Sequence, residues 1–159
     1  MAYAIHDADV QQLRKLLLNL IERTESDDCI ICDTGGFILA EEGQTAGHHP
    51  QIAALGAGVF SASRELARLI GETDFNTVFH QGTNKSIFIS AVNSEILLVN
   101  IFSSTASVGL VKLYTTPAAA ECRVLFDAIK VRNEKDGGAG DHRLFVLRDK
   151  ADVFTPKNP

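Results

Sequence analysis

Residues 50–102 combine a helical pattern with three strand-like patterns, which restricts the chain to a mixed fold. The helical segment, PQIAALGAGVFSASRELARLIGE, is followed by three short apolar runs, DFNTVFHQ, SIFISAV and EILLVNIF. Turn-forming residues at 82–85 and 93–94 separate these runs. Runs joined by such short turns pair most simply as an antiparallel meander. The last run is apolar on both faces apart from Asn100, which predicts a central strand covered on both sides.

The segment before this block predicts a helix and a hairpin. Residues 29–41 form two apolar runs around a turn, Asp33-Thr34-Gly35-Gly36, whose residues tolerate the backbone conformations of a tight hairpin. Pro50 suits the first turn of the next helix. The first helix is expected over residues 6–24, capped by Asp7 or Asp9. Its apolar residues recur at spacings of three and four: Val10, Leu13, Leu16, Leu17, Leu20 and Ile21.

The segment from 107 to 130 predicts a long last helix. Its repeating positions are Val108, Val111, Thr115, Ala118, Cys122, Leu125 and Ile129. The spacing continues through Pro117, so we favour one kinked helix, although an interior proline costs about 3 kcal/mol. The alternative is a helix that restarts with Thr116 as its cap and Pro117 in its first turn. Beyond Arg132 the composition becomes that of a flexible linker, followed by an apolar-basic segment that is either disordered or a docking element.

These elements predict an α+β domain over residues 1–132, with a five-stranded antiparallel sheet, and a tail over residues 133–159. The net charge of −5 and the scattered Lys and Arg residues argue against a nucleic-acid partner. No apolar run approaches the roughly 20 residues of a membrane span, so we expect no membrane insertion. The first residues lack the apolar core of a signal peptide, and three cysteines suggest a reducing compartment. We therefore expect a cytoplasmic protein.

The candidate catalytic and metal-binding residues do not assemble into a site. Cys29 and Cys32 have C-x-x-C spacing, but residues i and i+3 of a strand point to opposite faces, so both sulfurs cannot bind one ion. His80 lacks the surrounding motif that would make Cys122 or Ser86 a nucleophile. No Gly-rich phosphate loop or H-E-x-x-H motif is present. We predict no catalytic residue, no metal ligand and no cofactor.

The helix after Pro50 is unusually rich in small residues, and three of its faces can be distinguished. The predicted core stripe is Ile52, Leu55, Val59, Ala62, Leu66 and Leu69, beside a flanking row of Ala53, Gly56, Phe60, Ser63, Ala67 and Ile70. The third face carries Ala54, Ala57, Ser61, Arg64, Glu65 and Arg68. Glycine costs up to about 1 kcal/mol inside a helix, so Gly56 and Gly58 need a compensating contact. Tight packing within one chain could supply it, but we favour a symmetric contact between the helices of two subunits.

In this order, CDTGGFILAEEG, IAALGAGVFSASRELARLIGE, FHQG, ILLVNIF and SVGLVKLY resemble the Roadblock family, and especially the bacterial MglB group. The resemblance covers about residues 10–130. It implies an α/β/α sandwich and a homodimer in which edge strands join two sheets and the second helices lie side by side. It also implies that the paired helices bind a small Ras-like GTPase, whose hydrolysis is accelerated through its own switch loops.

Carried over by position, the resemblance implies two sets of residues in this chain. Ala57, Ser61, Arg64, Glu65 and Arg68 would face the GTPase. The dimer interface would include Gly56, Phe60, Ser63 and Ala67 of the helix and Phe75, Thr77 and Phe79 of the joining strand at 75–80. An arginine finger from Arg64 or Arg68 is disfavoured, because exposed arginines on a helix are common.

Two functions from different classes follow. The leading hypothesis is a homodimeric GTPase regulator without an active site, whose partner holds the GTP and magnesium. The alternative is a small-molecule sensor with a ligand cavity between the sheet and a helix. Such a cavity needs a few convergent polar groups, which the predicted core positions do not supply.

Overall fold

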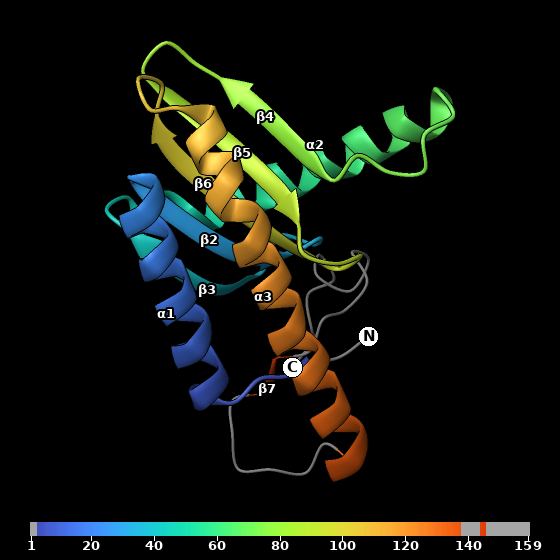
Figure 1. Ribbon diagram of the computed structural model, residues 1–159. Coiled ribbons are helices and arrows are strands. Elements are labelled where there is room, and N and C mark those ends of the chain that lie inside the picture. Colours follow the sequence, from blue (N-terminus) through green and yellow to red (C-terminus); the bar gives the residue numbers. More distant parts are fainter. Residues whose placement is uncertain (1–2, 138–143, 146–159) are drawn as a thin grey trace, which may run out of the picture.

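The computed structural model describes residues 3–137 and 144–145 and shows an α+β fold (Figure 1). In chain order the elements are β1 (Tyr3–Ala4), α1 (Asp7–Thr24), β2 (Asp28–Asp33), β3 (Ile38–Gly43), the 3-10 helix η1 (Ala46–His48), α2 (His49–Leu69), β4 (Thr77–Gln81), β5 (Lys85–Ala91), β6 (Ile96–Ser103), α3 (Val108–Asp136) and β7 (Leu144–Phe145). The predicted order of helix, hairpin, helix, three-strand meander and long helix is confirmed.

The main sheet has five antiparallel strands in the order β3-β2-β6-β5-β4. Helices α1 and α3 lie side by side over one face and α2 covers the other, which makes a three-layer sandwich (Figure 1). Strand β6 lies in the middle, and its residues 96–102 are all buried, as predicted. Its one polar core side chain, Asn100, donates to Thr115 Oγ1 of α3 at 2.5 Å and accepts from the Cys29 thiol, so its amide is satisfied.

Helix α1 begins one residue after His6, which occupies the N-cap position. The carboxylate of Asp9 accepts a hydrogen bond from the backbone N–H of His6 at 2.7 Å, so an acidic side chain does satisfy this end of the helix. Arg132 of α3 donates to both oxygens of Asp9, at 3.0 and 2.7 Å. The start of α1 is therefore tied to the end of α3.

Helix α3 is continuous through Pro117, so the single long helix is confirmed and the restart at Thr116 is wrong. The helix begins after Ser107, whose side chain accepts from the Leu110 N–H, and ends at Gly137 in the left-handed conformation. It therefore extends through residues 133–136, which we predicted to be linker. Of the predicted tail segment, Leu144–Phe145 forms strand β7 and pairs with β1, while residues 146–159 lie outside the described residues. A separable tail stays a prediction.

The three cysteines lie in the two core layers as expected for buried thiols. Cys29 faces α1 and α3, whereas Cys32 faces α2, so the prediction that their side chains point to opposite faces is confirmed. Burial raises the pKa of all three thiols, to about 12 for Cys32 and Cys122. Cys122 of α3 is buried in the core that α1 and α3 form with the sheet, while His80 is exposed on β4, so the two do not meet.

Candidate interaction surface

Helix α2 rests on the sheet through a narrow face of small residues and one aromatic ring. Ala53, Ala57 and Phe60 are buried there, against Ile89 of β5 and Leu97 and Val99 of β6, and Ala67 is buried further along the helix. Gly36 in the β2–β3 turn, at φ +90°, lies so close to α2 that a Cβ there would come within 2.6 Å of the Ala54 Cα. The buried alanines thus serve close packing inside one chain, and a Cβ at Gly56 would lie 3.5 Å from Ile89 Cδ1. Gly58 faces open space among the described residues, so a contact between subunits stays a prediction there.

The predicted core stripe of α2 is therefore wrong at most of its positions, although Ile52 does pack against the core beneath the helix. Leu55, Leu66 and Leu69 are 72%, 59% and 75% exposed, and Ile70, just after the helix, is 70% exposed. Large apolar residues lie on several faces of this helix, so their spacing did not identify the side that fits a closely packed sheet. At spacings of three and four, the solvent-facing residues form what we call the outer α2 stripe: Leu55, Gly58, Ala62, Leu66 and Leu69.

Because α2 faces the sheet with a different side than predicted, several residues of the predicted interfaces are buried within the chain. Ala57, expected to face a GTPase, is 1% exposed and belongs to the core, as do Phe60 and Ala67, which were expected at a dimer contact. Gly56 and Ser63 are partly buried on the flank of the helix. A substitution at Phe60 would thus act first on folding, because its ring packs against its own sheet.

The polar residues of α2 divide between the surface and the chain's own loops. Arg64 donates from Nε to Asp74 Oδ1 at 3.0 Å, which fastens α2 to the segment before β4. Glu65 and Arg68 form an exposed ion pair at 2.8 Å, with Ser61 one turn earlier on the same flank. These three residues, called here the polar flank of α2, stay available to a partner.

Strand β4 is an edge of the sheet, since β5 is its one neighbour within the described residues. It begins at Thr77, so Phe75 lies before it, half-buried, and the expected joining strand is shorter than predicted. Phe79 is 39% exposed and its ring stacks on Phe102 with centroids 6.2 Å apart. Unpaired backbone groups on an edge strand favour pairing with another chain.

The C-terminal turns of α2 and the β4 edge follow each other along the chain. Residues 70–76 connect them directly, and Figure 1 shows the last turns of α2 extending beyond the sheet. Leu66, Leu69 and Ile70 lie on or just after these turns. One partner could therefore cover both an apolar helix end and a strand edge.

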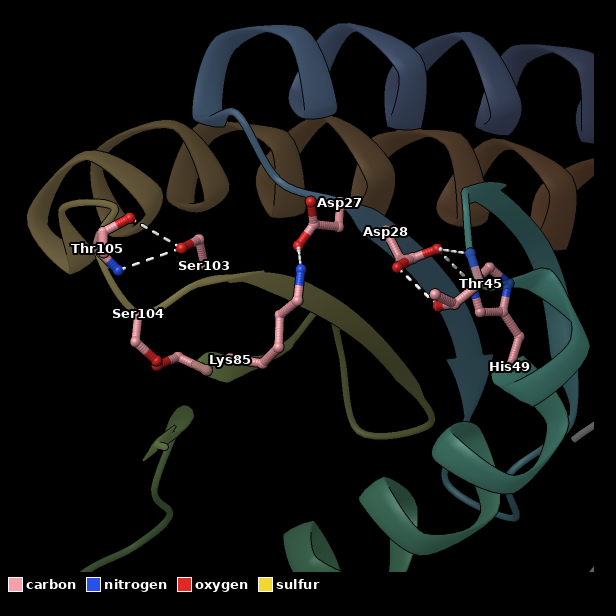
Figure 2. A network of polar contacts seen from close by, with 9 residues as sticks. Asp27, Asp28, Thr45, His49, Lys85, Ser103, Ser104 and Thr105 are labelled. Carbon is pink, nitrogen blue, oxygen red and sulfur yellow. Dashed lines mark hydrogen bonds and ion pairs between the residues drawn. The ribbon is translucent and has the colours of Figure 1, made fainter. Parts of the chain in front are cut away.

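The other end of α2 is held by a buried polar network that the sequence analysis missed (Figure 2). His49 is 0% exposed, with Nε2 2.9 Å from Asp28 Oδ1 on β2 and Nδ1 2.8 Å from Glu41 Oε2 on β3. Thr45 donates to Asp28 from both its backbone N–H and its hydroxyl, each at 2.8 Å. A histidine beside Pro50 at a helix start was the available signal, but its partners are 8 and 21 residues away.

The electrostatics of this network favour an ionised Asp28. Burial raises the pKa of its carboxyl, but hydrogen bonds from the Thr45 backbone, His49 and the Thr45 hydroxyl outweigh burial and leave the pKa below its usual value. The two ring nitrogens of His49 thus lie within hydrogen-bond distance of two carboxylates. The network fixes the position of the first turn of α2 against the β2–β3 hairpin.

The described residues form neither a metal site nor a membrane span. Within the part of the chain that the structure describes, no three His, Cys, Asp or Glu side chains gather in a way that could hold a metal ion. None of the helices described is both long and apolar enough to cross a membrane.

Comparisons with known proteins place this geometry among related folds. Residues 13–102 match the family model of the Roadblock/LC7 domain. The structure of Myxococcus xanthus MglB is 30% identical, with a TM-score of 0.70 over 74% of this chain and 96% of that one. The gliding protein MglB of Thermus thermophilus is 25% identical, with a TM-score of 0.73 over 79% and 96%. A structure described as MglB with tetrameric arrangement is 25% identical, with a TM-score of 0.75 over 80% and 96%. No curated protein matches the sequence.

Proposed function

Because the chain belongs to the Roadblock/LC7 family, we propose that it is a homodimeric regulator that binds a small Ras-like GTPase and stimulates its GTP hydrolysis. The observation that carries this proposal is the exposed apolar side of α2 beside the unpaired edge of β4. A monomeric soluble protein rarely exposes a large contiguous apolar patch without a partner. The similarity to the MglB group suggests that the partners are a second copy of the chain and a small Ras-like GTPase.

The second copy of the chain fits the end of the molecule where α2 extends beyond the sheet. There the two β4 edges would pair, while Leu66, Leu69 and Ile70 would be covered by the other subunit. Both features recur in the second copy, as a two-fold interface requires. A stable interface buries roughly 1,200–2,000 Å² in total, which one strand and one helix end from each subunit can supply.

The GTPase would bind the remaining outer face of α2. Leu55 lies about 16 Å along the helix from Leu66, at a rise of 1.5 Å per residue, so the two ends of the stripe can serve different partners. Gly58 and Ala62, which lie between Leu55 and Leu66, have small side chains that let a partner approach the helix backbone closely. The polar flank of Ser61, Glu65 and Arg68 borders this surface. These side chains would position the switch loops of the GTPase, whose own residues, magnesium and GTP carry out the hydrolysis.

A binding and turnover experiment tests this function. A purified small Ras-like GTPase from the same organism is loaded with GTP or GDP, mixed with the protein, and followed by co-elution and phosphate release. We expect co-elution that depends on the bound nucleotide and faster phosphate release. Failure to co-elute in either state, with an unchanged hydrolysis rate, would refute the proposal.

A further inference from the structure

A cleft of about 510 Å³ lies where α2, the start of β4, the β5–β6 turn and the middle of α3 meet. Phe60, Phe75, Val92 and Ala119 give it apolar walls, and polar residues from the surrounding elements complete the lining. This volume is within the range of small-molecule sites. The cleft is separate from the outer α2 stripe, which faces away from the sheet.

Two arginines from opposite sides border the cleft. Arg123 of α3 donates from Nε to the Val92 carbonyl at 2.6 Å, and Arg64 of α2 donates from Nε to Asp74. These bonds hold each guanidinium in place, and the two terminal nitrogens of Arg123 make no hydrogen bond within the described part of the chain. Asp74 is the one carboxylate among the lining residues, so the cleft has a local excess of positive charge in a chain of net charge −5.

A serine hydroxyl lines the same cleft. Ser90 on β5 is 5% exposed and lies on the sheet face that α3 covers, two residues after the buried Phe88. Its hydroxyl forms no hydrogen bond with any residue that the structure describes, although it borders the cleft. The hydroxyl opens on the cleft, where it can donate to a polar ligand.

We propose that this cleft binds a small oxyanion, a phosphate or a carboxylate group, between Arg123 and Arg64. Guanidinium groups recognise such groups through paired charge-assisted hydrogen bonds. The Ser90 hydroxyl donates a further hydrogen bond from the floor of the cleft. A bound oxyanion would link α2 to α3 across the end of the sheet, close to the segment that leads into β4.

The probes are inorganic phosphate and acetate, each titrated into the full-length protein against sodium chloride of equal ionic strength. Backbone amide NMR shifts and thermal melting follow the binding. We expect saturable shifts confined to residues 76–77, 90–94 and 119–123 and a rise in the melting temperature. The anion that binds more tightly identifies the natural group as a phosphate or a carboxylate.

Three variants and a control connect the binding to these residues. Arg123→Gln should weaken anion affinity about tenfold or more, Arg123→Lys less so, and Ser90→Ala several-fold. Arg14→Gln removes the same charge from the Arg14–Glu42 pair at the β3 edge of the sheet, the edge opposite β4, and should leave the affinity unchanged.

The proposal is overturned if the shifts do not saturate, if chloride reproduces them, or if Arg14→Gln weakens binding as much as Arg123→Gln. If Arg123→Gln does not fold, Ser90→Ala decides, because it removes one hydroxyl and leaves both arginines in place. Unchanged affinity in a folded Ser90→Ala protein, together with unchanged affinity in Arg123→Lys, would also overturn it.

Discussion

His49 Nε2 lies 2.9 Å from Asp28 Oδ1, and this contact joins the first turn of α2 to the first residue of β2 (Figure 2). Both side chains are almost completely buried, at 0% and 1% exposure. Because the other ring nitrogen lies 2.8 Å from Glu41 Oε2 of β3, the imidazole connects three elements. The orientation of α2, and with it the surface that α2 exposes, depends on this contact.

Replacing His49 by alanine is expected to destabilise the fold by about 3 kcal/mol. The change leaves Asp28 buried with its charge partly uncompensated, and breaking a buried pair on one side is strongly destabilising. Urea unfolding followed by circular dichroism measures the effect. His48→Ala is the matched control, since His48 is exposed and its side chain makes no capping hydrogen bond. Equal stability of His49→Ala and His48→Ala would show that the network has no structural role.

Stability is expected to fall on acidification below about pH 4. Asp28 and Asp9 have pKa values lowered in the folded state, because hydrogen bonds outweigh the effect of burial. Their contribution is complete above the unfolded carboxyl pKa of about 3.9 and is lost as the pH falls through the folded pKa. Asp33, whose pKa burial raises, acts in the opposite direction.

Unfolding free energies measured between about pH 3 and pH 7 test this linkage, because this interval spans the ordinary carboxyl pKa of about 4. Asp9→Asn should reduce the loss of stability at low pH, because the variant cannot bind the proton that disrupts the contact with Arg132. A variant whose pH profile follows that of the wild type would argue against a lowered pKa at Asp9.

Phe60→Ala is expected to destabilise each subunit by about 3 kcal/mol, since it opens a cavity between α2 and the sheet. The ring is 3% exposed and packs in the cluster beneath α2. Leu55→Ala on the same helix should change the unfolding free energy by less than about 0.5 kcal/mol, because Leu55 is 72% exposed. Comparable losses for the two variants would contradict the observed orientation of α2.

Arg68→Ala is expected to reduce stimulation of the GTPase several-fold while leaving the fold intact. Arg68 belongs to the polar flank, and its exposed pair with Glu65 contributes less than about 1 kcal/mol to stability. Phosphate-release rates at saturating protein, beside thermal melting, separate the two effects. Arg14→Ala provides the control for loss of a surface charge. Full stimulation by Arg68→Ala would show that Arg68 of the polar flank does not contribute to the action on the GTPase.

The sheet and helices α1 and α3 could be predicted, because each follows from the local pattern of apolar and polar residues. The run at 96–102 is apolar on both pleat faces, which a central strand requires, and it is buried throughout. The C-x-x-C spacing places Cys29 and Cys32 on opposite faces by the two-residue period of a strand. The apolar spacing continued unchanged through Pro117, and α3 is one helix.

The orientation of α2 could not be predicted, because apolar side chains lie on more than one of its faces. Leu55 and Leu69 are better core candidates by size than Ala53 and Ala57, yet the small residues allow α2 to approach the sheet and the Gly36 turn closely. That preference comes from the shape of the facing surface, which only the assembled fold defines. The cleft near Arg123 also depends on residues from distant parts of the chain.

The mass of the protein in solution tests the central claim most directly. Light scattering at micromolar concentration should give twice the 17.2 kDa mass of one chain. Leu69→Asp should give a folded protein with the mass of a single chain, because a carboxylate would be buried in the apolar contact between subunits. A wild-type protein that is monomeric at this concentration, or a Leu69→Asp variant that remains dimeric, would contradict association through the α2 end and the β4 edge.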